Sequence, residues 1–284
     1  MAIFTNQAQL SYGDVTTSSN VAVGEILEAL SISKTAIPST YTTGDSIAYV
    51  INIVNSSSTP ITGLSVSDDL GAYQFNETSL VPLTYVDDSA KYFINGVLQP
   101  SVDVNVGTEI VFSGIDVPAN GNVAIVYSTT VNDFAPVSID GFITNTVRAT
   151  GAGITPIEAS ETIYASATPN VSITKSISPI PVAPNGLVAY TFVIENRGVA
   201  PLDTTDNAVI TDLFDPILRN INVVFNSETW SEGVNYTYDE ATGEFATVPG
   251  QVTVAGASYA QDPTTGVWAL TPGTSTIVIT GNIG

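Results

Sequence analysis

Lysine is rare in this chain, and two of its three lysines lie at the same position of a repeated sequence. Lys34 ends the stretch Leu-Ser-Ile-Ser-Lys, and Lys175 ends Val-Ser-Ile-Thr-Lys, at an offset of 175 − 34 = 141 residues. If each stretch is a strand, alternation places the lysine on the same face as the apolar residues before it. A buried ammonium without a partner is costly, so each lysine should meet an acid or lose its proton.

Two further polar residues lie on apolar strand faces. By the same alternation, Asp68 shares a face with Leu64 and Val66, and Asn145 lies among apolar residues on its own strand. A lysine and an acid that are desolvated together can exchange a proton, which leaves a neutral amine that is a nucleophile. Attack of this amine on an asparagine carboxamide releases ammonia and leaves an isopeptide bond. The sequence therefore predicts a crosslink between Lys34 and Asn145, with Asp68 as the residue that polarises the carbonyl and shuttles protons.

A second set of the same residue types is divided between the two ends of the chain. Lys175 is followed by Asp212, which aligns with Asp68 once three extra residues are allowed in the second repeat. The matching asparagine is Asn6, on the face that also carries Phe4, Ala8 and Leu10. We therefore expect Lys175 and Asp212 of one molecule to react with Asn6 of another.

A simpler alternative stays open for both sets of residues. Each lysine can extend along the apolar surface to the rim of its domain and form an ordinary salt bridge with the aspartate, while the asparagine makes local hydrogen bonds.

The elements that position these residues are predicted to be strands. Val, Ile, Thr, Ser and Tyr are abundant, and Gly and Pro interrupt the chain at short intervals without a long helical period. The 141-residue offset also relates Tyr49 to Tyr190 and Pro60 to Pro201. We predict an all-β protein with two tandem immunoglobulin-like β-sandwich domains. We divide the chain into three segments, an N-terminal donor strand segment (1–27), a first repeat (28–168) and an incomplete second repeat (169–284).

The N-terminal stretch resembles the strand that closes the first repeat. Residues 3–12 are similar to residues 142–150, and the second repeat contains no copy of this stretch. A sandwich without its closing strand has an open edge, and strand donation repairs such an edge. The predicted donor strand presents Ile3, Phe4, Ala8 and Leu10 to the next molecule, which gives a head-to-tail homopolymer. Two alternatives stay open, a segment of a longer array and closure within one chain.

Composition excludes several classes of function. The chain has no Cys and no His, which removes thiol and histidine catalysis and zinc sites of those residues. A net charge of −21 argues against nucleic acid as a partner, and no stretch is apolar enough for membrane insertion. We predict no cofactor and no metal site. Calcium stays open as an alternative partner because of acidic pairs such as Asp68-Asp69, Asp87-Asp88 and Asp239-Glu240.

Both repeats resemble the bacterial surface-protein family called domain of unknown function 11. The resemblance is carried by the two lysine strands, by Gly-Asp-Ser-Ile-Ala-Tyr at residues 44–49, by Val-Ser-Asp-Asp-Leu at 66–70 and by Ile-Thr-Asn-Thr-Val at 143–147. The lysine, aspartate and asparagine also resemble the autocatalytic isopeptide domains of Gram-positive pilins and adhesins. These resemblances imply an extracellular or cell-surface structural protein that is no enzyme beyond its own crosslinking. The alternative is an adhesin or stalk fragment that binds a host or matrix ligand without polymerising.

Overall fold

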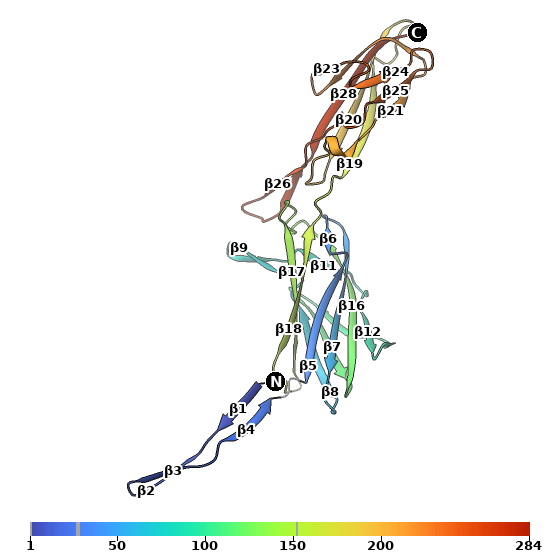
Figure 1. Ribbon diagram of the computed structural model, residues 1–284. Helices are drawn as coiled ribbons and strands as arrows, with labels where there is room; N and C mark the ends of the chain where they lie inside the picture. The colour runs from blue at the N-terminus through green and yellow to red at the C-terminus, as the bar shows by residue number, and fades with distance from the viewer. Residues whose placement is uncertain (1, 27–28, 152) are drawn as a thin grey trace.

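The computed structural model is built almost entirely of strands and describes residues 2–26, 29–151 and 153–284, with side chains from residue 4 onward except at 25 and 26. Three parts follow one another along an elongated molecule, a thin N-terminal ribbon, a first domain and a second domain (Figure 1). A single 3-10 turn, η1 (Thr204–Asp206), is the only helical element within the described ranges. The predicted all-β fold class with two tandem sandwiches is confirmed.

The first domain is a sandwich of two sheets. One sheet has the order β13, β12, β16, β7 and β5, with β11 also paired to β16. The other sheet has the order β14, β15, β8, β17, β18 and β6, while β9 and β10 form a separate hairpin. The strands span β5 (Leu30–Ile37), β6 (Thr40–Tyr41), β7 (Ser46–Asn55), β8 (Ile61–Asp68), β9 (Tyr73–Phe75), β10 (Thr78–Leu80), β11 (Leu83–Tyr85), β12 (Lys91–Ile94), β13 (Val97–Leu98), β14 (Asp103–Val106), β15 (Ile110–Val117), β16 (Gly121–Val131), β17 (Phe142–Thr150) and β18 (Ile157–Ala165).

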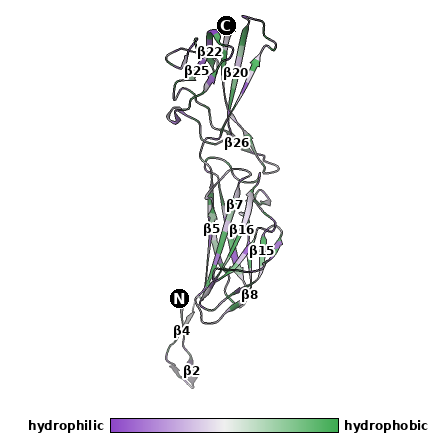
Figure 2. Cartoon of the chain, turned by 90° about the vertical axis from the view of Figure 1, so that its right-hand side faces the viewer, coloured by the Kyte–Doolittle hydropathy of each residue, from purple (hydrophilic) through white to green (hydrophobic). Residues whose placement is uncertain are grey.

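The core of the first domain follows from strand alternation. In β7 every second residue from Ile47 to Asn55 is buried, and β16 shows the same period from Val123 to Val131. The apolar colouring of these strands is visible in Figure 2. Tyr127 of β16 stacks on Tyr49 of β7, with ring centroids 5.6 Å apart, at the centre of this core. The two central strands thus place large side chains between the sheets.

The second domain repeats the central part of this arrangement. One sheet has the order β19, β20, β28, β22 and β23, and a smaller sheet has the order β21, β25 and β24. The hairpin β26–β27 extends from this domain toward the first. The strands span β19 (Val171–Ser178), β20 (Leu187–Asn196), β21 (Thr211–Leu213), β22 (Leu218–Phe225), β23 (Glu228–Trp230), β24 (Tyr236–Tyr238), β25 (Glu244–Thr247), β26 (Ser258–Gln261), β27 (Trp268–Thr271) and β28 (Gly273–Ile283).

Residue pairing relates the strands of the two domains. Lys34 of β5 lies opposite Ile51 of β7, and Lys175 of β19 lies opposite Phe192 of β20, both at the offset of 141. The pair β8–β15 corresponds to β21–β25. Asp68 of β8 lies opposite a residue of β15, and Asp212 of β21 lies opposite a residue of β25. In the first domain β17 pairs with the other edge of β8. Among the described residues, no strand pairs with that edge of β21.

The N-terminal ribbon is a two-stranded extension of four short pieces. β1 (Ala2–Asn6) pairs with β4 (Ala22–Ile26), and β2 (Gln9–Tyr12) pairs with β3 (Val15–Ser18) around a turn at Gly13, whose φ is +56°. The predicted donor strand is therefore one half of a hairpin, and only the backbone of Ile3 is described. The ribbon leaves the first domain at the end opposite the second domain (Figures 1 and 2). Closure onto the second domain of the same chain does not occur in this structure.

The two domains touch through the hairpin β26–β27. The Trp268 amide donates to the carbonyl of Asp133 at 2.9 Å, and Gln261 Nε2 donates to the Tyr73 hydroxyl at 3.1 Å. The side chains of Tyr259 and Trp268 pack against the core of the first domain. These contacts connect the two sandwiches beyond the linker between β18 and β19. No helix in the described part of the chain is long and apolar enough to cross a membrane.

Removal of the ribbon should leave the two sandwiches intact. Phe4, Leu10 and Tyr12 are each more than half exposed, so the ribbon contributes little to either core. Deletion of residues 1–26 is expected to change the melting temperature of the monomer, measured by calorimetry, by less than about 4 °C, the shift that ~1 kcal/mol produces in a chain of this size. A larger decrease would mean that the ribbon packs on its own molecule in solution.

Candidate functional site

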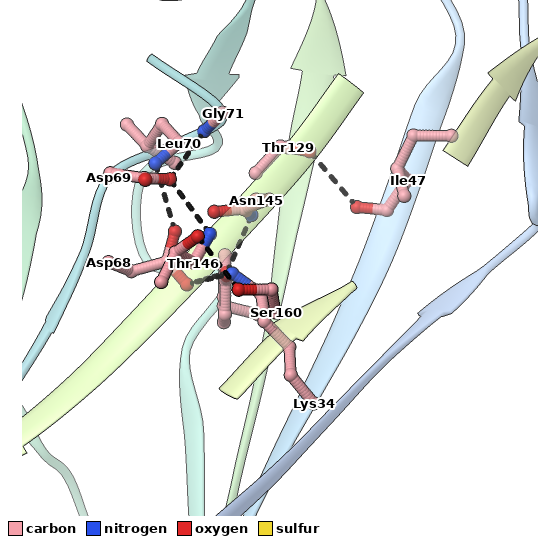
Figure 3. Close-up of polar contacts among 11 residues, drawn as sticks. Lys34, Ile47, Asp68, Asp69, Leu70, Gly71, Thr129, Asn145, Thr146 and Ser160 are labelled. Carbon is pink, nitrogen blue, oxygen red and sulfur yellow. Dashed lines mark hydrogen bonds and ion pairs between the residues drawn. The ribbon is translucent and has the colours of Figure 1, made fainter. Parts of the chain in front are cut away.

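Lys34 and Asp68 form an ion pair inside the first domain. Lys34 Nζ lies 2.5 Å from Asp68 Oδ2, and neither side chain has any exposed surface. The two residues come from strands of opposite sheets, β5 and β8, whose inward faces carry them toward each other (Figure 3). The other oxygen of Asp68 accepts a hydrogen bond from the Leu70 amide at 3.0 Å. The lysine is therefore buried between the sheets and does not extend to the rim of the domain.

Asn145 completes the predicted set through a tyrosine that the sequence did not single out. Asn145 is fully buried on β17, and its Nδ2 lies 3.4 Å from the hydroxyl of Tyr127. The same hydroxyl donates to Asp68 Oδ2 at 2.5 Å. The Asn145 Oδ1 atom is buried without a hydrogen-bond partner. The structure thus brings Lys34, Asp68 and Asn145 together, with Tyr127 between the acid and the amide nitrogen.

Burial sets the protonation behaviour of this cluster. Desolvation lowers the pKa of Lys34, and the attraction of Asp68 opposes this shift only in part. Desolvation and the adjacent Asp68 both raise the pKa of Tyr127, so its hydroxyl keeps its proton and acts as a donor. A lysine with a lowered pKa is more readily neutral, and a neutral amine has the free electron pair that attack on a carboxamide requires.

The cluster is chemically complete for the predicted crosslink. Lys34 supplies the nucleophile, Asn145 the electrophile and leaving group, and Asp68 an acid that can hold the proton of the ammonium. An acid and a hydroxyl in one dry site can pass protons to the departing nitrogen as the amine attacks. The isopeptide bond between Lys34 and Asn145 remains a prediction that this geometry favours.

Tyr127 gave no signal in the sequence because it looks like an ordinary core residue. It alternates with Ile125 and Thr129 on the inward face of β16, and its ring stacks on Tyr49 as core aromatics commonly do. Only the three-dimensional structure shows that its hydroxyl joins Asp68 to Asn145. In the second domain the corresponding residue is Ile279, since Tyr49 pairs with Tyr127 and Tyr190 pairs with Ile279.

The second set of predicted residues is only partly assembled. Lys175 and Asp212 form an ion pair as in the first domain, but their side chains are 38% and 16% exposed. The Lys175 ammonium lies over the rings of Tyr190, Phe192 and Phe214. Asn6 ends β1 of the ribbon, and β1 lies beyond the end of the first domain that is far from the second domain (Figure 1). The structure therefore provides the acid and base of this site without its asparagine.

One of the acidic pairs considered for calcium, Asp68-Asp69, is held by hydrogen bonds within the first domain. Asp69 accepts hydrogen bonds from the amides of Gly71 and Thr146, which connects β17 to the loop after β8. Partial burial raises the pKa of its carboxyl. Within the described ranges, no group of three or more acidic side chains is placed to hold a metal ion.

Comparison of the sequence with protein families and with curated proteins identified no relative. No protein-family model matches the chain, and no curated protein matches its sequence. The resemblance to domain of unknown function 11 therefore stays a prediction.

Solved structures with a similar arrangement of strands include two pilins and an adhesin domain. BcpA, the major pilin subunit of Bacillus cereus, is 12% identical, with 96% of this chain and 73% of that chain covered and a TM-score of 0.36. The pilus backbone RrgB from Streptococcus pneumoniae is 15% identical, with 86% and 55% covered and a TM-score of 0.35. A collagen-binding domain from a Staphylococcus aureus adhesin is 13% identical, with 46% and 93% covered and a TM-score of 0.28. This chain thus spans about half of the RrgB structure, and the likeness says nothing about its activity.

Substitution of Asn145 tests the first crosslink without disturbing the ion pair. The intact mass of the wild-type monomer should be lower than the mass calculated from the sequence by the mass of one ammonia. The Asn145→Ala monomer should have its full calculated mass. The bond would close a loop of 145 − 34 = 111 residues, so its loss should lower the free energy of unfolding by about 4 to 5 kcal/mol if a covalent link acts through chain entropy. A wild-type protein of full calculated mass would contradict the prediction.

Substitution of Tyr127 tests whether its hydroxyl takes part. Tyr127→Phe keeps the ring and should slow the loss of ammonia, so that unbonded protein becomes detectable by mass spectrometry. The slowed reaction should accelerate as the pH rises through the lowered pKa of Lys34, because only the neutral amine attacks. Tyr85→Phe is the matched control, since its ring lies 6.4 Å from that of Tyr127 while its hydroxyl accepts from Ala90. Equal rates in the two variants would exclude a role for the Tyr127 hydroxyl.

Proposed function

We propose that this protein is the structural subunit of an extracellular fibre that grows head to tail. The N-terminal ribbon of one molecule completes the second domain of the next, and an isopeptide bond between Lys175 and Asn6 seals the joint. The observation that carries this proposal is the difference between the two domains. Lys34 of β5 is covered, whereas Lys175, its counterpart in β19, lies in a strand whose eight residues are all exposed.

The uncovered surface of the second domain is apolar and has a free backbone edge. Val171, Ile173 and Ile177 of β19 are exposed, and the edge of β21 that corresponds to the β17 side of β8 is unpaired within the described residues. Burial of a side chain of this size contributes about 1.5 to 3 kcal/mol, and an edge strand accepts another strand through main-chain hydrogen bonds. Both features favour a strand-shaped partner.

The ribbon has the matching properties. Phe4 is 55% exposed and Leu10 is 63% exposed, so each side chain offers apolar surface that a partner can bury. By strand alternation Phe4 shares a face of β1 with Asn6, the asparagine for which the described residues of the second domain show no counterpart. Leu10 is predicted from the sequence to lie on the same face. Docking of this face would bury apolar surface on both molecules and bring the carboxamide to Lys175 in one step.

The covalent step at the joint balances without any cofactor. Asp212 takes a proton from the Lys175 ammonium, and the neutral amine attacks the side-chain carbonyl carbon of Asn6 of the next molecule. A bond from the lysine nitrogen to that carbon forms as the bond to the amide nitrogen breaks. The nitrogen leaves as ammonia with one proton from the amine, and it takes the proton of Asp212 as it departs as ammonium. Asp212 returns to its carboxylate form, whereas the Lys175 amine and the Asn6 carboxamide are consumed. The reaction therefore occurs once for each joint, and the protein is no enzyme in the ordinary sense.

An extracellular or cell-surface location fits a polymer of this kind. A charge of −21 on each subunit would keep neighbouring fibres apart in solution. The alternative function is an adhesin or stalk fragment that stays monomeric and binds a host or matrix ligand. Assembly of the purified protein separates the two, since an adhesin fragment needs no contact with its own copies.

Electrophoresis of boiled protein in SDS is the direct test of the sealed joint. The wild-type chain should give a ladder of covalent oligomers, and mass spectrometry should identify peptides that join Lys175 to Asn6. Asn6→Ala should abolish the ladder, while Asn20→Ala, another asparagine of the ribbon, should retain it. A single band at the monomer mass, together with no fibres by electron microscopy, would overturn the proposed function.

A further inference from the structure

The two strands of the ribbon pair in the same register as β17 and β18. Phe4 lies opposite Gly24 and Asn6 opposite Ala22, whereas Ile143 lies opposite Ile163 and Asn145 opposite Glu161. The differences 143 − 4, 163 − 24, 145 − 6 and 161 − 22 all equal 139. A single offset therefore relates both strands at once. Only the distal part, β2–β3, departs from it, by a shift of one residue.

The inward face of the ribbon is shaped by both strands together. In the first domain, Ile143 and Ile163 are buried neighbours on β17 and β18. Their counterparts are Phe4 and Gly24, and the Phe4 ring lies over Gly24 so closely that a Cβ there would come within 2.4 Å of it. The ribbon thus has Phe4 and Gly24 at the two positions where the first domain has Ile143 and Ile163. The position of the Phe4 ring depends on β4.

The outward face of the ribbon corresponds to a surface that stays in solvent. Thr144 and Thr162 share a hydrogen bond between their hydroxyls at 2.8 Å on the exposed side of β17 and β18. Their counterparts, Thr5 and Val23, lie opposite each other and are exposed. A change confined to this pair would not touch an acceptor domain that binds the other face.

The acceptor surface has places for two strands. In the first domain β17 pairs with β8, while β18 packs beside β5. The second domain leaves both corresponding places uncovered, the edge of β21 and the side of β19. A single donated strand would cover the first place and leave β19 in water. Separation of the ribbon would also break its own ladder, in which each hydrogen bond contributes about 0.5 to 1.5 kcal/mol.

We propose that the partner of this surface is the intact two-stranded ribbon of a second copy, which enters already paired and not as a single strand. This inference rests on the proposed function. It also fixes the register of the joint. Val147 lies opposite Asp68 and Arg148 opposite Ser67 in the first domain, so Ala8 should lie opposite Asp212 and Gln9 opposite Thr211. Within each chain, β17–β18 precedes the second domain and packs on the first, as the ribbon precedes the first domain. The ribbon would then pack on the second domain of another molecule in the same way as β17–β18 packs on the first domain.

A reversible lock between the ribbon strands tests this proposal. The natural chain has no cysteine, so Thr5→Cys combined with Val23→Cys introduces one possible disulfide, on the outward face. Oxidised double variant should assemble within about twofold of the wild-type rate, followed by light scattering, and reduction should change little. If the oxidised variant stays monomeric and reduction restores assembly, the strands must separate and the proposal is overturned.

A second pair of variants tests the contribution of β4. Gly24→Glu places a charge at the counterpart of buried Ile163, and Val23→Glu places the same charge on the outward face. We expect Gly24→Glu to slow assembly at least tenfold and Val23→Glu to have little effect. Equal assembly by both variants would mean that β4 stays outside the joint. If the wild-type protein itself does not assemble, the proposed fibre is overturned and this inference with it. If the wild-type protein assembles but the variants behave as described for a separated ribbon, only the paired ribbon is overturned.

Discussion

The first sandwich of this protein is closed by one pair of strands, whose inward residues Ile143, Val147 and Ile163 belong to its core. In the first domain this pair is β17–β18, which covers β5, extends the sheet of β8 and brings Asn145 into the interior. Without such a pair, one sheet ends at an unpaired edge and the opposite sheet exposes its inner side. The second domain shows this condition directly, because β19 is exposed along its whole length and β21 has a free edge within the described residues.

The same pair of strands controls the electrostatics of the lysine. Lys34 and Lys175 each meet an aspartate, yet only Lys34 is fully removed from water. Desolvation is what lowers the pKa of a lysine and permits a neutral amine, so the covering strands supply the dry environment and the asparagine together. In our proposal, assembly and chemistry are therefore coupled. A second domain without its partner holds an ordinary, partly exposed ion pair, and the reaction can begin only after docking.

Much of this arrangement was predictable because strands have a period of two and the chain repeats itself. The offset between Lys34 and Lys175 identified the equivalent strands, and alternation placed Lys34, Asp68 and Asn145 on inward faces that the structure brings together. Tyr127 could not be predicted, because an aromatic residue on a core strand is far more often packing than chemistry. The role of β4 was also out of reach, since Val15 to Ile26 has little sequence likeness to β18 and its register is visible only in the paired backbone.

Electron cryo-microscopy of fibres formed by the purified wild-type protein would show the joint between subunits. In the proposed fibre the second domain of each subunit contains two additional strands from the next molecule, with density between Lys175 and Asn6 and with Lys175 as deeply buried as Lys34. Fibres in which the ribbon lies in solvent and the edge of β21 stays open would contradict it, as would subunits that meet through any other surface.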